Sequence, residues 1–357
     1  MGRKIAFIGP LPPPVGGVAL ANLRVQRVLT TIRPHDTIIN YNTSKGQANA
    51  DLYKRKSIAE FFHLLRNIGG VLRFVARHRI EVSNVFVVPN ISFVREAIFI
   101  IILKLTTRKL VIHLHAKTEG DYFLEGWKLK VFTKIIALGD VVFVLSEKFH
   151  RKFYAKYINE RKLVVLENFI EDKEFDNPID EKQNDCLYVG RLSEKKGFFT
   201  LVEAVSKIHT QFPHLKIHVL GEFENADFEQ KVTTLLAQED ISAFHFYGAV
   251  MGEEKAQFFK ENKIFLFPSY FENSPIVLKE AVAAKMAILA SDIKENKNIL
   301  DPIGNTEYFR RKDSDDLADK LSGLLLDQSR VRQMMHASEN AELFNYSSAR
   351  EVINIHI

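Results

Sequence analysis

Arg191 and Lys196 lie in a loop bounded by glycines, Gly190–Gly197, which follows an apolar run. The loop reads Gly-Arg-Leu-Ser-Glu-Lys-Lys-Gly. Arg191 offers a planar fork of N–H donors and Lys196 a compact positive charge, and together these groups suit a diphosphate. The alternative interpretation is a basic turn exposed to solvent that binds no ligand. The loop alone therefore indicates a phosphate site without establishing one.

A second polar loop, Pro268–Pro275, also follows an apolar run. We expect Ser274 to cap a helix and Pro275 to be its first residue, with backbone N–H groups facing a ligand. Glu272 precedes this helix and Glu280 lies inside it, and carboxylates accept hydrogen bonds from sugar hydroxyls. A capped helix with two incidental glutamates is the alternative.

The N-terminal half offers a glycine pair and two histidines. Gly16 and Gly17 close a proline-rich loop at the expected start of a helix, where bare backbone lets a ligand approach. The loop lacks the Gly-x-Gly-x-x-Gly spacing of dinucleotide-binding proteins, and a turn without a ligand is its simpler interpretation. His113 lies inside an apolar run and is more typical of packing, whereas His115 lies at the end of that run.

Apolar runs alternate with helical segments along most of the chain. Runs that are apolar nearly throughout are typical of parallel strands covered on both faces, and their alternation with helices predicts βαβ units. Ligands of such sheets bind beyond the carboxyl ends of the strands, so the loops described above are where chemistry is expected. The predicted strands are Lys4–Gly9, Glu81–Val88, Lys109–Leu114, Asp140–Leu145, Leu163–Leu166, Cys186–Val189, Lys216–Leu220, Ala243–Tyr247, Ile264–Phe267 and Ala287–Ala290.

A polar, acidic stretch interrupts this alternation at residues 171–184 and is the predicted linker. We expect an α/β protein of two doubly wound domains, residues 1–170 and 185–340. The first 170 residues carry 27 Lys and Arg against 12 Asp and Glu, and residues 171–357 carry 22 against 32. A basic half joined to an acidic half indicates two domains with different partners.

Composition excludes several classes of protein. The 357 residues are 46% hydrophobic and 26% charged, which is typical of a globular chain and excludes disorder and fibres. The single cysteine, Cys186, excludes an internal disulfide framework, a four-cysteine zinc site and an iron–sulfur cluster, and it fits a reducing compartment. The run Ala97–Leu103 is too short to span a bilayer, so it predicts a buried helix or one that dips into a membrane surface.

Residues 60–79 combine aromatic and aliphatic side chains at helical spacing with arginines. Such a basic amphipathic surface suits an anionic membrane, while an ordinary solvated helix face is the alternative. Nucleic acid is the least favoured partner, because the candidate phosphate-binding residues lie in the acidic half of the chain. The interleaved arginines are Arg66, Arg73, Arg77 and Arg79.

Together the two C-terminal loops resemble the C-terminal domain of family-4 retaining glycosyltransferases. The resemblance is carried by the loop at Arg191 and Lys196, by the sequence Phe-Pro-Ser-x-x-Glu and by the spacing Glu272-x7-Glu280. It implies the GT-B fold, two Rossmann-like domains facing across a cleft. It also implies that the last helix, within 341–357, crosses back to the N-terminal domain.

The resemblance further implies roles for the site residues. Arg191 and Lys196 would neutralise the diphosphate as it leaves, Glu272 would contact the donor sugar, and Glu280 would hold the ribose. His115 would lie near the donor sugar as a fourth catalytic residue. Backbone and side-chain contacts to the donor would come from Gly16, Gly17, Asn273, Ser274, Pro275, Ile276, Gly221 and Val250.

The implied activity is transfer of a hexose, with retention of configuration, from a nucleotide-diphosphate sugar to a glycan or lipid-linked acceptor in bacterial envelope polysaccharide synthesis. A nucleotide-sugar 2-epimerase and a catalytically idle nucleotide-sugar-binding protein are the alternatives. No cofactor or metal is expected: Asp313-Ser-Asp315 matches a metal-binding Asp-x-Asp, but we interpret it as a helix cap. The expected location is the cytoplasm, with the basic domain on the inner face of the membrane.

Overall fold

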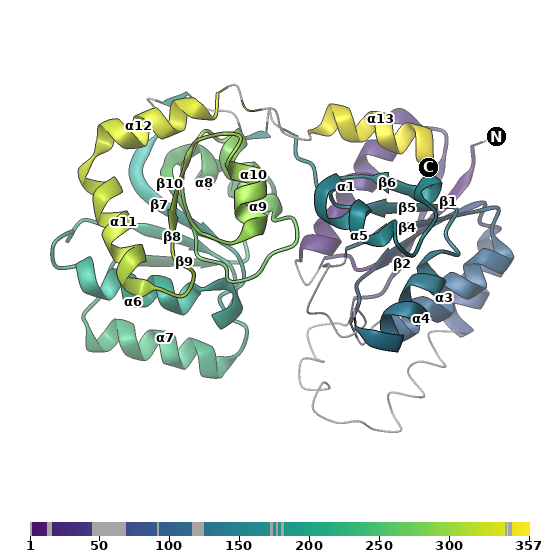
Figure 1. Ribbon diagram of the computed structural model, residues 1–357, viewed down its shortest axis with the longest axis horizontal. Helices are drawn as coiled ribbons and strands as arrows, with labels where there is room; N and C mark the ends of the chain where they lie inside the picture. The colour runs from purple at the N-terminus through teal and green to yellow at the C-terminus, as the bar shows by residue number, and fades with distance from the viewer. Residues whose placement is uncertain are drawn as a thin grey trace. The chain divides into compact units, whose positions relative to one another are not determined.

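The computed structural model divides the chain into two compact units (Figure 1). Unit 1 comprises Met1–Phe169 and Tyr346–Ile357, and unit 2 comprises Ile170–Asn345. The structure describes residues 2–12, 16–44, 69–90, 93–115, 125–171, 174–175, 178–179, 182–339, 341 and 345–357. The part of the basic segment before residue 69 lies outside these residues, and residues 69–78 are helical.

Unit 1 is built on a parallel six-stranded sheet with the order β2-β1-β3-β4-β5-β6. Its inner strands are buried along nearly their whole length, since helices cover both faces of the sheet. The strands are β1 (Lys4–Gly9), β2 (Thr37–Asn42), β3 (Val82–Val87), β4 (Lys109–Leu114), β5 (Val141–Val144) and β6 (Leu163–Val165).

The last helix of the chain belongs to unit 1. Helix α13 (Tyr346–His356) packs against α1 (Gly17–Ile32), and Arg3 donates a 3.0 Å hydrogen bond to the carbonyl oxygen of Ile357. Figure 1 draws α13 in yellow beside α1, at the opposite end of the colour scale. Other helices of this unit include α3 (Phe93–Thr106), α4 (Gly126–Ile136), a π-helical turn (Glu147–Arg151) and α5 (Lys152–Tyr154).

Unit 2 holds a second parallel six-stranded sheet, with the order β12-β11-β10-β7-β8-β9. The chain winds outward from β7 on one side and returns through β10 to wind on the other side, so β7 and β10 are neighbours at the point of reversal. In doubly wound sheets this switch point is where ligands bind. The strands are β7 (Gln183–Val189), β8 (Ile217–Leu220), β9 (Phe244–Gly248), β10 (Asn262–Phe267), β11 (Ala287–Ser291) and β12 (Thr306–Phe309).

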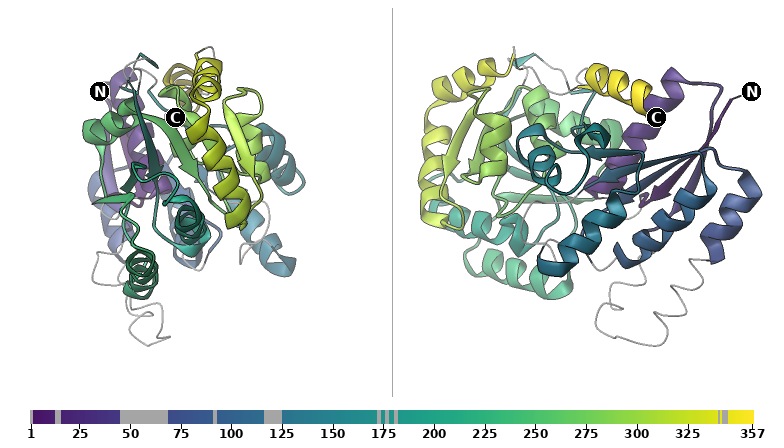
Figure 2. Two further views of the ribbon diagram at one scale, coloured as in Figure 1. Left: turned by 90° about the vertical axis from the view of Figure 1, so that its left-hand side faces the viewer. Right: turned by 45° about the vertical axis from the view of Figure 1, so that its right-hand side comes forward.

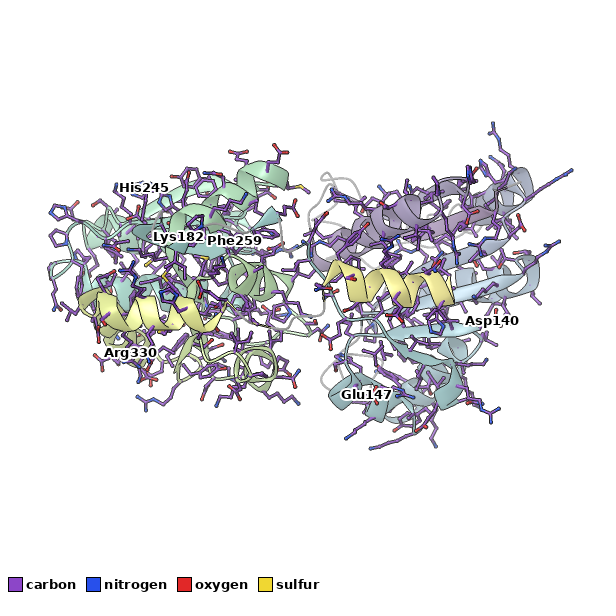
Figure 3. The ribbon with its side chains drawn as sticks, turned by 90° about the horizontal axis from the view of Figure 1, so that it is seen from above. Asp140, Glu147, Lys182, His245, Phe259 and Arg330 are labelled. Atoms are coloured by element: carbon purple, nitrogen blue, oxygen red, sulfur yellow. The ribbon has the colours of Figure 1, made fainter. Side chains whose placement is uncertain are left out.

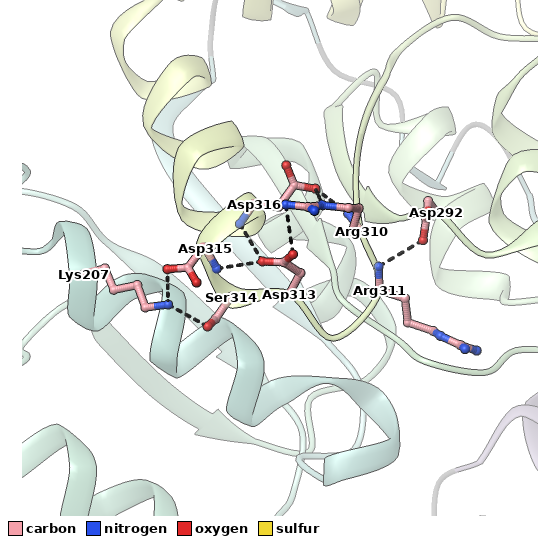
Figure 4. A network of polar contacts seen from close by, with 8 residues as sticks. All are labelled: Lys207, Asp292, Arg310, Arg311, Asp313, Ser314, Asp315 and Asp316. Carbon is pink, nitrogen blue, oxygen red and sulfur yellow. Dashed lines mark hydrogen bonds and ion pairs between the residues drawn. The ribbon is translucent and has the colours of Figure 1, made fainter.

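The helices of unit 2 bury apolar faces against this sheet. One of them, α11, begins at the aspartate motif: the Asp313 carboxylate accepts hydrogen bonds from the backbone N–H groups of Asp315 and Asp316 (Figure 4). The predicted helix cap is confirmed. The helices are α6 (Phe198–Ile208), α7 (Ala226–Gln238), α8 (Gly252–Glu261), α9 (Ile276–Ala283), α10 (Lys294–Leu300), α11 (Ser314–Leu326) and α12 (Gln328–Ala337).

Two strands have no counterpart in the sequence prediction, and both lie at sheet edges. β2 is half exposed along its length and reads Thr-Ile-Ile-Asn-Tyr-Asn, and β12 is likewise half buried. Edge strands lack the continuous apolar run used to find the inner ones. β7 begins at Gln183, inside the predicted linker, because its first residues extend into solvent and are polar.

Helix α3 contains the apolar run Ala97–Leu103. One of its faces, with Phe99, Ile100 and Leu103, is fully buried, whereas Ile101 and the following Leu105 are exposed. Within the described residues no helix is long and apolar enough to cross a membrane.

Candidate active site

The switch point of unit 2 brings together the two loops singled out in the sequence. The loop after β7 carries Lys196 and the loop after β10 carries Glu272, and Lys196 Nζ lies 2.6 Å from Glu272 Oε1. The Glu272 side chain is nearly buried, whereas Lys196 is about one-third exposed. Two residues 76 positions apart thus form one charged pair at the carboxyl ends of adjacent strands.

The two loops also touch through their backbones. Gly197 has φ +66°, and a Cβ added there would lie 1.9 Å from the carbonyl oxygen of Pro268, so only glycine fits. The Tyr270 N–H donates to the Lys195 carbonyl at 3.0 Å, and the Tyr270 and Thr200 hydroxyls are 2.6 Å apart. The positions of Lys196 and Glu272 are therefore set by one rigid contact between loops.

Arg191 belongs to the same loop as Lys196. The buried Tyr188 hydroxyl donates to the Arg191 carbonyl at 3.0 Å and holds the loop, and burial with Glu272 nearby raises the pKa of Tyr188. The Arg191 side chain is exposed, and the structure gives its guanidinium no ion pair within the described residues. The loop that carries Lys196 thus also presents an exposed guanidinium, which can bind an anion.

Helix α9 starts one residue later than the sequence predicts. Pro275 has φ −70° and ψ 113°, an extended conformation, so it occupies the cap position and Ile276 is the first helical residue. The predicted assignment of Ser274 as cap and Pro275 as first helical residue is therefore wrong by one position. Asn273 and Ser274 are half-buried in the loop before the helix, and Pro275 and Ile276 are buried.

Glu280 lies in the second turn of α9 and is almost completely buried, with 1% of its side chain exposed. Its Oε2 accepts from Lys255 Nζ at 2.5 Å, and Lys255 comes from α8. The sequence prediction missed this lysine, because nothing in the spacing of α8 indicates that it faces Glu280. The ion pair with this ammonium holds the Glu280 carboxylate in one orientation.

The end of α8 is anchored separately by Lys182, which precedes β7. Its ammonium donates to the carbonyls of Phe259 and Lys260, at 2.6 and 2.8 Å, and more weakly to that of Asn262 (Figure 3 labels Lys182 and Phe259). A cation on the last carbonyls of a helix satisfies groups that have no partner within the helix. Burial, with Lys285 nearby, lowers the pKa of Lys182 to about 7.

Two further predicted residues lie at the same sheet edge. Gly221 follows β8, and a Cβ added there would lie 1.9 Å from the Gly190 carbonyl oxygen, so this glycine has a packing reason of its own. Its N–H donates to Gly248 at the end of β9, and half-buried Val250 follows two residues later. The residues that end or follow β7, β8 and β9 are therefore in contact with one another at the carboxyl edge of the sheet.

Gly16 and Gly17, in unit 1, stand at the start of α1, with extended Gly16 in the cap position. A Cβ added to either glycine would meet nothing within 4 Å. Packing inside the protein therefore does not explain these two glycines, unlike Gly197 and Gly221.

His113 and His115 are both buried in unit 1. His113 lies in β4, stacks on Phe86 with ring centroids 4.3 Å apart, and bonds Asn84 at 3.1 Å, so the packing interpretation is confirmed. His115 follows β4, and its backbone N–H donates to the Val87 carbonyl at 2.9 Å. Burial, and then the nearby His150, lower the pKa of His115 to about 4, so its imidazole is neutral at pH 7.

A buried ion pair that the sequence prediction missed lies at the start of α3. Arg95 Nη2 is 2.8 Å from Glu96 Oε1, and Arg95 also donates to the Thr43 carbonyl at 3.3 Å. Within the described residues Glu96 Oε2 has no hydrogen-bond partner. Burial raises the pKa of Glu96 to about 7. The pair follows the carboxyl end of β3, next to β1 in the sheet.

Comparison with known proteins identifies unit 2. The family model for glycosyl transferases group 1 matches residues 169–343. This segment of the chain is therefore similar to the glycosyl transferases of group 1. The group 1 segment nearly coincides with Ile170–Asn345, so it contains the loops at Arg191, Lys196 and Glu272 and the Lys255–Glu280 pair.

Curated relatives of known activity align over part of their length. A phosphatidyl-myo-inositol mannosyltransferase of Mycolicibacterium smegmatis is 28% identical over 45% of this chain and 41% of its own length. A lipopolysaccharide 1,2-N-acetylglucosaminetransferase of Salmonella typhimurium is 23% identical over 67% of this chain and 63% of its own length. The chain thus spans about two fifths to two thirds of these relatives.

Solved structures match along nearly the whole chain. The Anabaena protein HepE, crystallised with UDP and glucose, has a TM-score of 0.75 at 16% identity and covers 99% of this chain and 98% of its own. The sucrose-phosphate synthase of Thermosynechococcus elongatus has a TM-score of 0.69 at 15% identity, over 99% of this chain and 94% of its own. The expected fold class is confirmed: the chain has the two Rossmann-like domains of the GT-B fold.

Proposed function

We propose that this protein is a glycosyltransferase that moves a sugar from a nucleotide-diphosphate sugar to a glycan or lipid-linked acceptor. The observation that carries the proposal is the Lys196–Glu272 pair at the switch point of unit 2, with Arg191 exposed in the loop that carries Lys196. The similarity of residues 169–343 to group 1, and relatives that are named mannosyl- and N-acetylglucosaminyltransferases, support it. We place the protein in bacterial envelope polysaccharide synthesis.

The proposed chemistry uses the charges of this loop cluster. The bond from the anomeric carbon to the diphosphate breaks with its electron pair on the phosphate oxygen, and Arg191 and Lys196 stabilise the charge that develops. The acceptor hydroxyl attacks the anomeric carbon from the same face and gives its proton to the departing diphosphate, so configuration is retained. Glu272 contacts the donor sugar, and Glu280 accepts from the ribose.

Unit 1 supplies the acceptor side in this proposal. Gly16 and Gly17 leave open space at the start of α1, which suits backbone N–H groups approaching a phosphate. His115 acts as a neutral hydrogen-bonding group near the donor sugar, because its lowered pKa keeps it uncharged.

Because two side-chain cations serve the diphosphate, we propose that transfer needs no metal and no cofactor, and that the protein works in the cytoplasm, where its buried Cys186 stays reduced. The test combines UDP-, GDP- and ADP-sugars with oligosaccharide and polyprenyl-phosphate acceptors, with EDTA present. We expect glycosylated product together with nucleoside diphosphate. Diphosphate release without acceptor, accompanied by a free altered sugar, would instead identify an epimerase.

The matched variants are Arg191→Met and Lys196→Met. Each removes a cation that stabilises the leaving group, so turnover should fall at least about 100-fold. The melting temperature should change little in Arg191→Met, whose side chain is exposed, and should fall in Lys196→Met, which leaves the nearly buried Glu272 without this partner. Lys216→Met, an exposed lysine before β8, is the control and should behave as wild type. Near-normal turnover in both site variants would refute the assignment.

A further inference from the structure

Helices α3 and α4 present apolar side chains on their outward faces. The two helices lie side by side on one side of the first sheet (Figures 1 and 2), and the Phe93 and Phe132 rings between them are 4.5 Å apart. Exposed apolar residues follow at helical spacing along both. We call this surface the α3–α4 face; its apolar members are Val94, Ile101, Leu105, Trp127 and Val131.

The spacing places these residues opposite the core. In α3, Val94, Ile101 and Leu105 fall within about 40° of one another on the helix, directly away from the buried Phe99 and Leu103. In α4, Trp127 and Val131 are one turn apart and point away from the buried Phe132 and Ile136. An amphipathic helix that packs on a sheet normally has polar side chains on its outward face. The α3–α4 face carries apolar side chains at those positions.

Two of these side chains are large and almost fully in solvent: Leu105 is 82% exposed and Trp127 71%. An exposed contiguous apolar face of this kind marks a site of association. Tryptophan is also the side chain most suited to the boundary between lipid and water, because its ring is apolar and its N–H is polar.

Positive charge accompanies the apolar residues of α4. Lys130 and Lys134 are exposed on the outward face of α4, and residues 126–136 contain no Asp or Glu. Lys104 in α3 is paired with Asp140 at 2.5 Å, so its charge is already balanced. A carboxylate, that of Glu125, occupies the cap position before α4.

From this combination we propose that the α3–α4 face docks unit 1 onto an anionic lipid bilayer. The apolar side chains enter the boundary between headgroups and acyl chains, and the lysine stems lie along it with their ammonium groups at the phosphates. The charges decide against a second copy of this chain as occupant, because two such faces would bring Lys130 and Lys134 against their own copies. The α3–α4 face shares no residue with the basic segment at residues 60–79, and the proposal goes beyond the transferase activity.

The experiment measures flotation of the full-length protein with vesicles of phosphatidylcholine alone or of equal parts phosphatidylcholine and phosphatidylglycerol, without any donor. We expect strong binding to the anionic vesicles, weak binding to the neutral ones, and about a fivefold loss for each of Lys130→Gln and Lys134→Gln. The double variant Trp127→Glu/Leu105→Glu should lose binding at least about 20-fold. Both side chains are exposed, so the variant should keep the wild-type melting temperature.

The matched control is Leu326→Glu, which places the same charge at another exposed leucine, 69% exposed at the end of α11 in unit 2. It should bind vesicles as wild type does. The proposal is overturned if wild type binds neither vesicle or if the double variant binds anionic vesicles normally. A wild-type dimer that the double variant loses, without vesicle binding, would assign the face to self-association instead. Donor-induced thermal stabilisation, measured in parallel, reports on the transferase site independently.

Discussion

Lys255 Nζ lies 2.5 Å from Glu280 Oε2, and 12% of the Lys255 side chain and 1% of the Glu280 side chain are exposed. The two residues come from α8 and α9, which precede and follow strand β10 in the sequence. Lys255 itself stays in place because α8 packs on β7 and is anchored at its end by Lys182. The proposed ribose contact therefore depends on a helix that carries no recognisable motif.

Removal of Lys255 should destabilise unit 2. Lys255→Met leaves the Glu280 carboxylate buried without this partner, at a cost of about 3 kcal/mol in the free energy of unfolding. The double variant Lys255→Met/Glu280→Gln should recover most of that stability but should not recover nucleotide-sugar binding. Denaturant unfolding and calorimetric titration with the donor measure the two effects. Restored donor binding in the double variant would exclude Glu280 from the ribose contact.

The pair Lys196–Glu272 should behave as one catalytic unit. Glu272→Gln keeps the shape of the side chain but removes its charge, so turnover should fall at least about 100-fold. Because the two groups touch, the double variant with Lys196→Met should lose less than the product of the two single losses. Steady-state kinetics of the four proteins test this, and strictly multiplicative losses would mean that the groups act separately.

Gly197, which packs against Pro268, should respond to substitution by alanine differently from Gly16 and Gly17, which have open space around them. At Gly197 the left-handed backbone and the Pro268 carbonyl exclude a methyl group, so Gly197→Ala should lower the melting temperature by about 5–10 °C. Gly16→Ala and Gly17→Ala place the methyl group in open space and should leave the melting temperature nearly unchanged. If a donor phosphate approaches there, they should still lower kcat/KM at least about tenfold. Unimpaired kinetics would remove this loop from the site.

Acid should destabilise unit 1 through its buried histidines. The pKa of His115 is about 4 in the folded protein and near 6.5 when unfolded, so the unfolded chain binds more protons between these values. Its contribution to stability is present above pH 6.5 and is lost as the pH falls to 4, about 3 kcal/mol in total. The free energy of unfolding, measured between pH 4 and 6.5, should change less steeply with pH in His115→Asn than in the wild type. The exposed His245 of unit 2 provides the control, since His245→Asn should leave the slope unchanged.

The inner strands of both sheets and the two loops at the switch point could be predicted from sequence alone. Continuous apolar runs identify strands covered on both faces, and Gly, Pro and charged residues after such runs identify the loops. The edge strands β2 and β12 were missed, because half-exposed strands carry mixed residues like those of loops.

The chemistry available at the site can be read from the amino-acid sequence: a guanidinium, an ammonium and two carboxylates follow strands of one predicted domain. Which of these groups pair depends on the folded chain, because pairing follows the order of strands in the sheet, which sequence spacing does not encode. Placing β7 beside β10 joins Lys196 to Glu272, and the packing of α8 joins Lys255 to Glu280. The same holds for Leu105 and Trp127, whose exposure follows from how α3 and α4 lie on their sheet and not from their hydrophobicity.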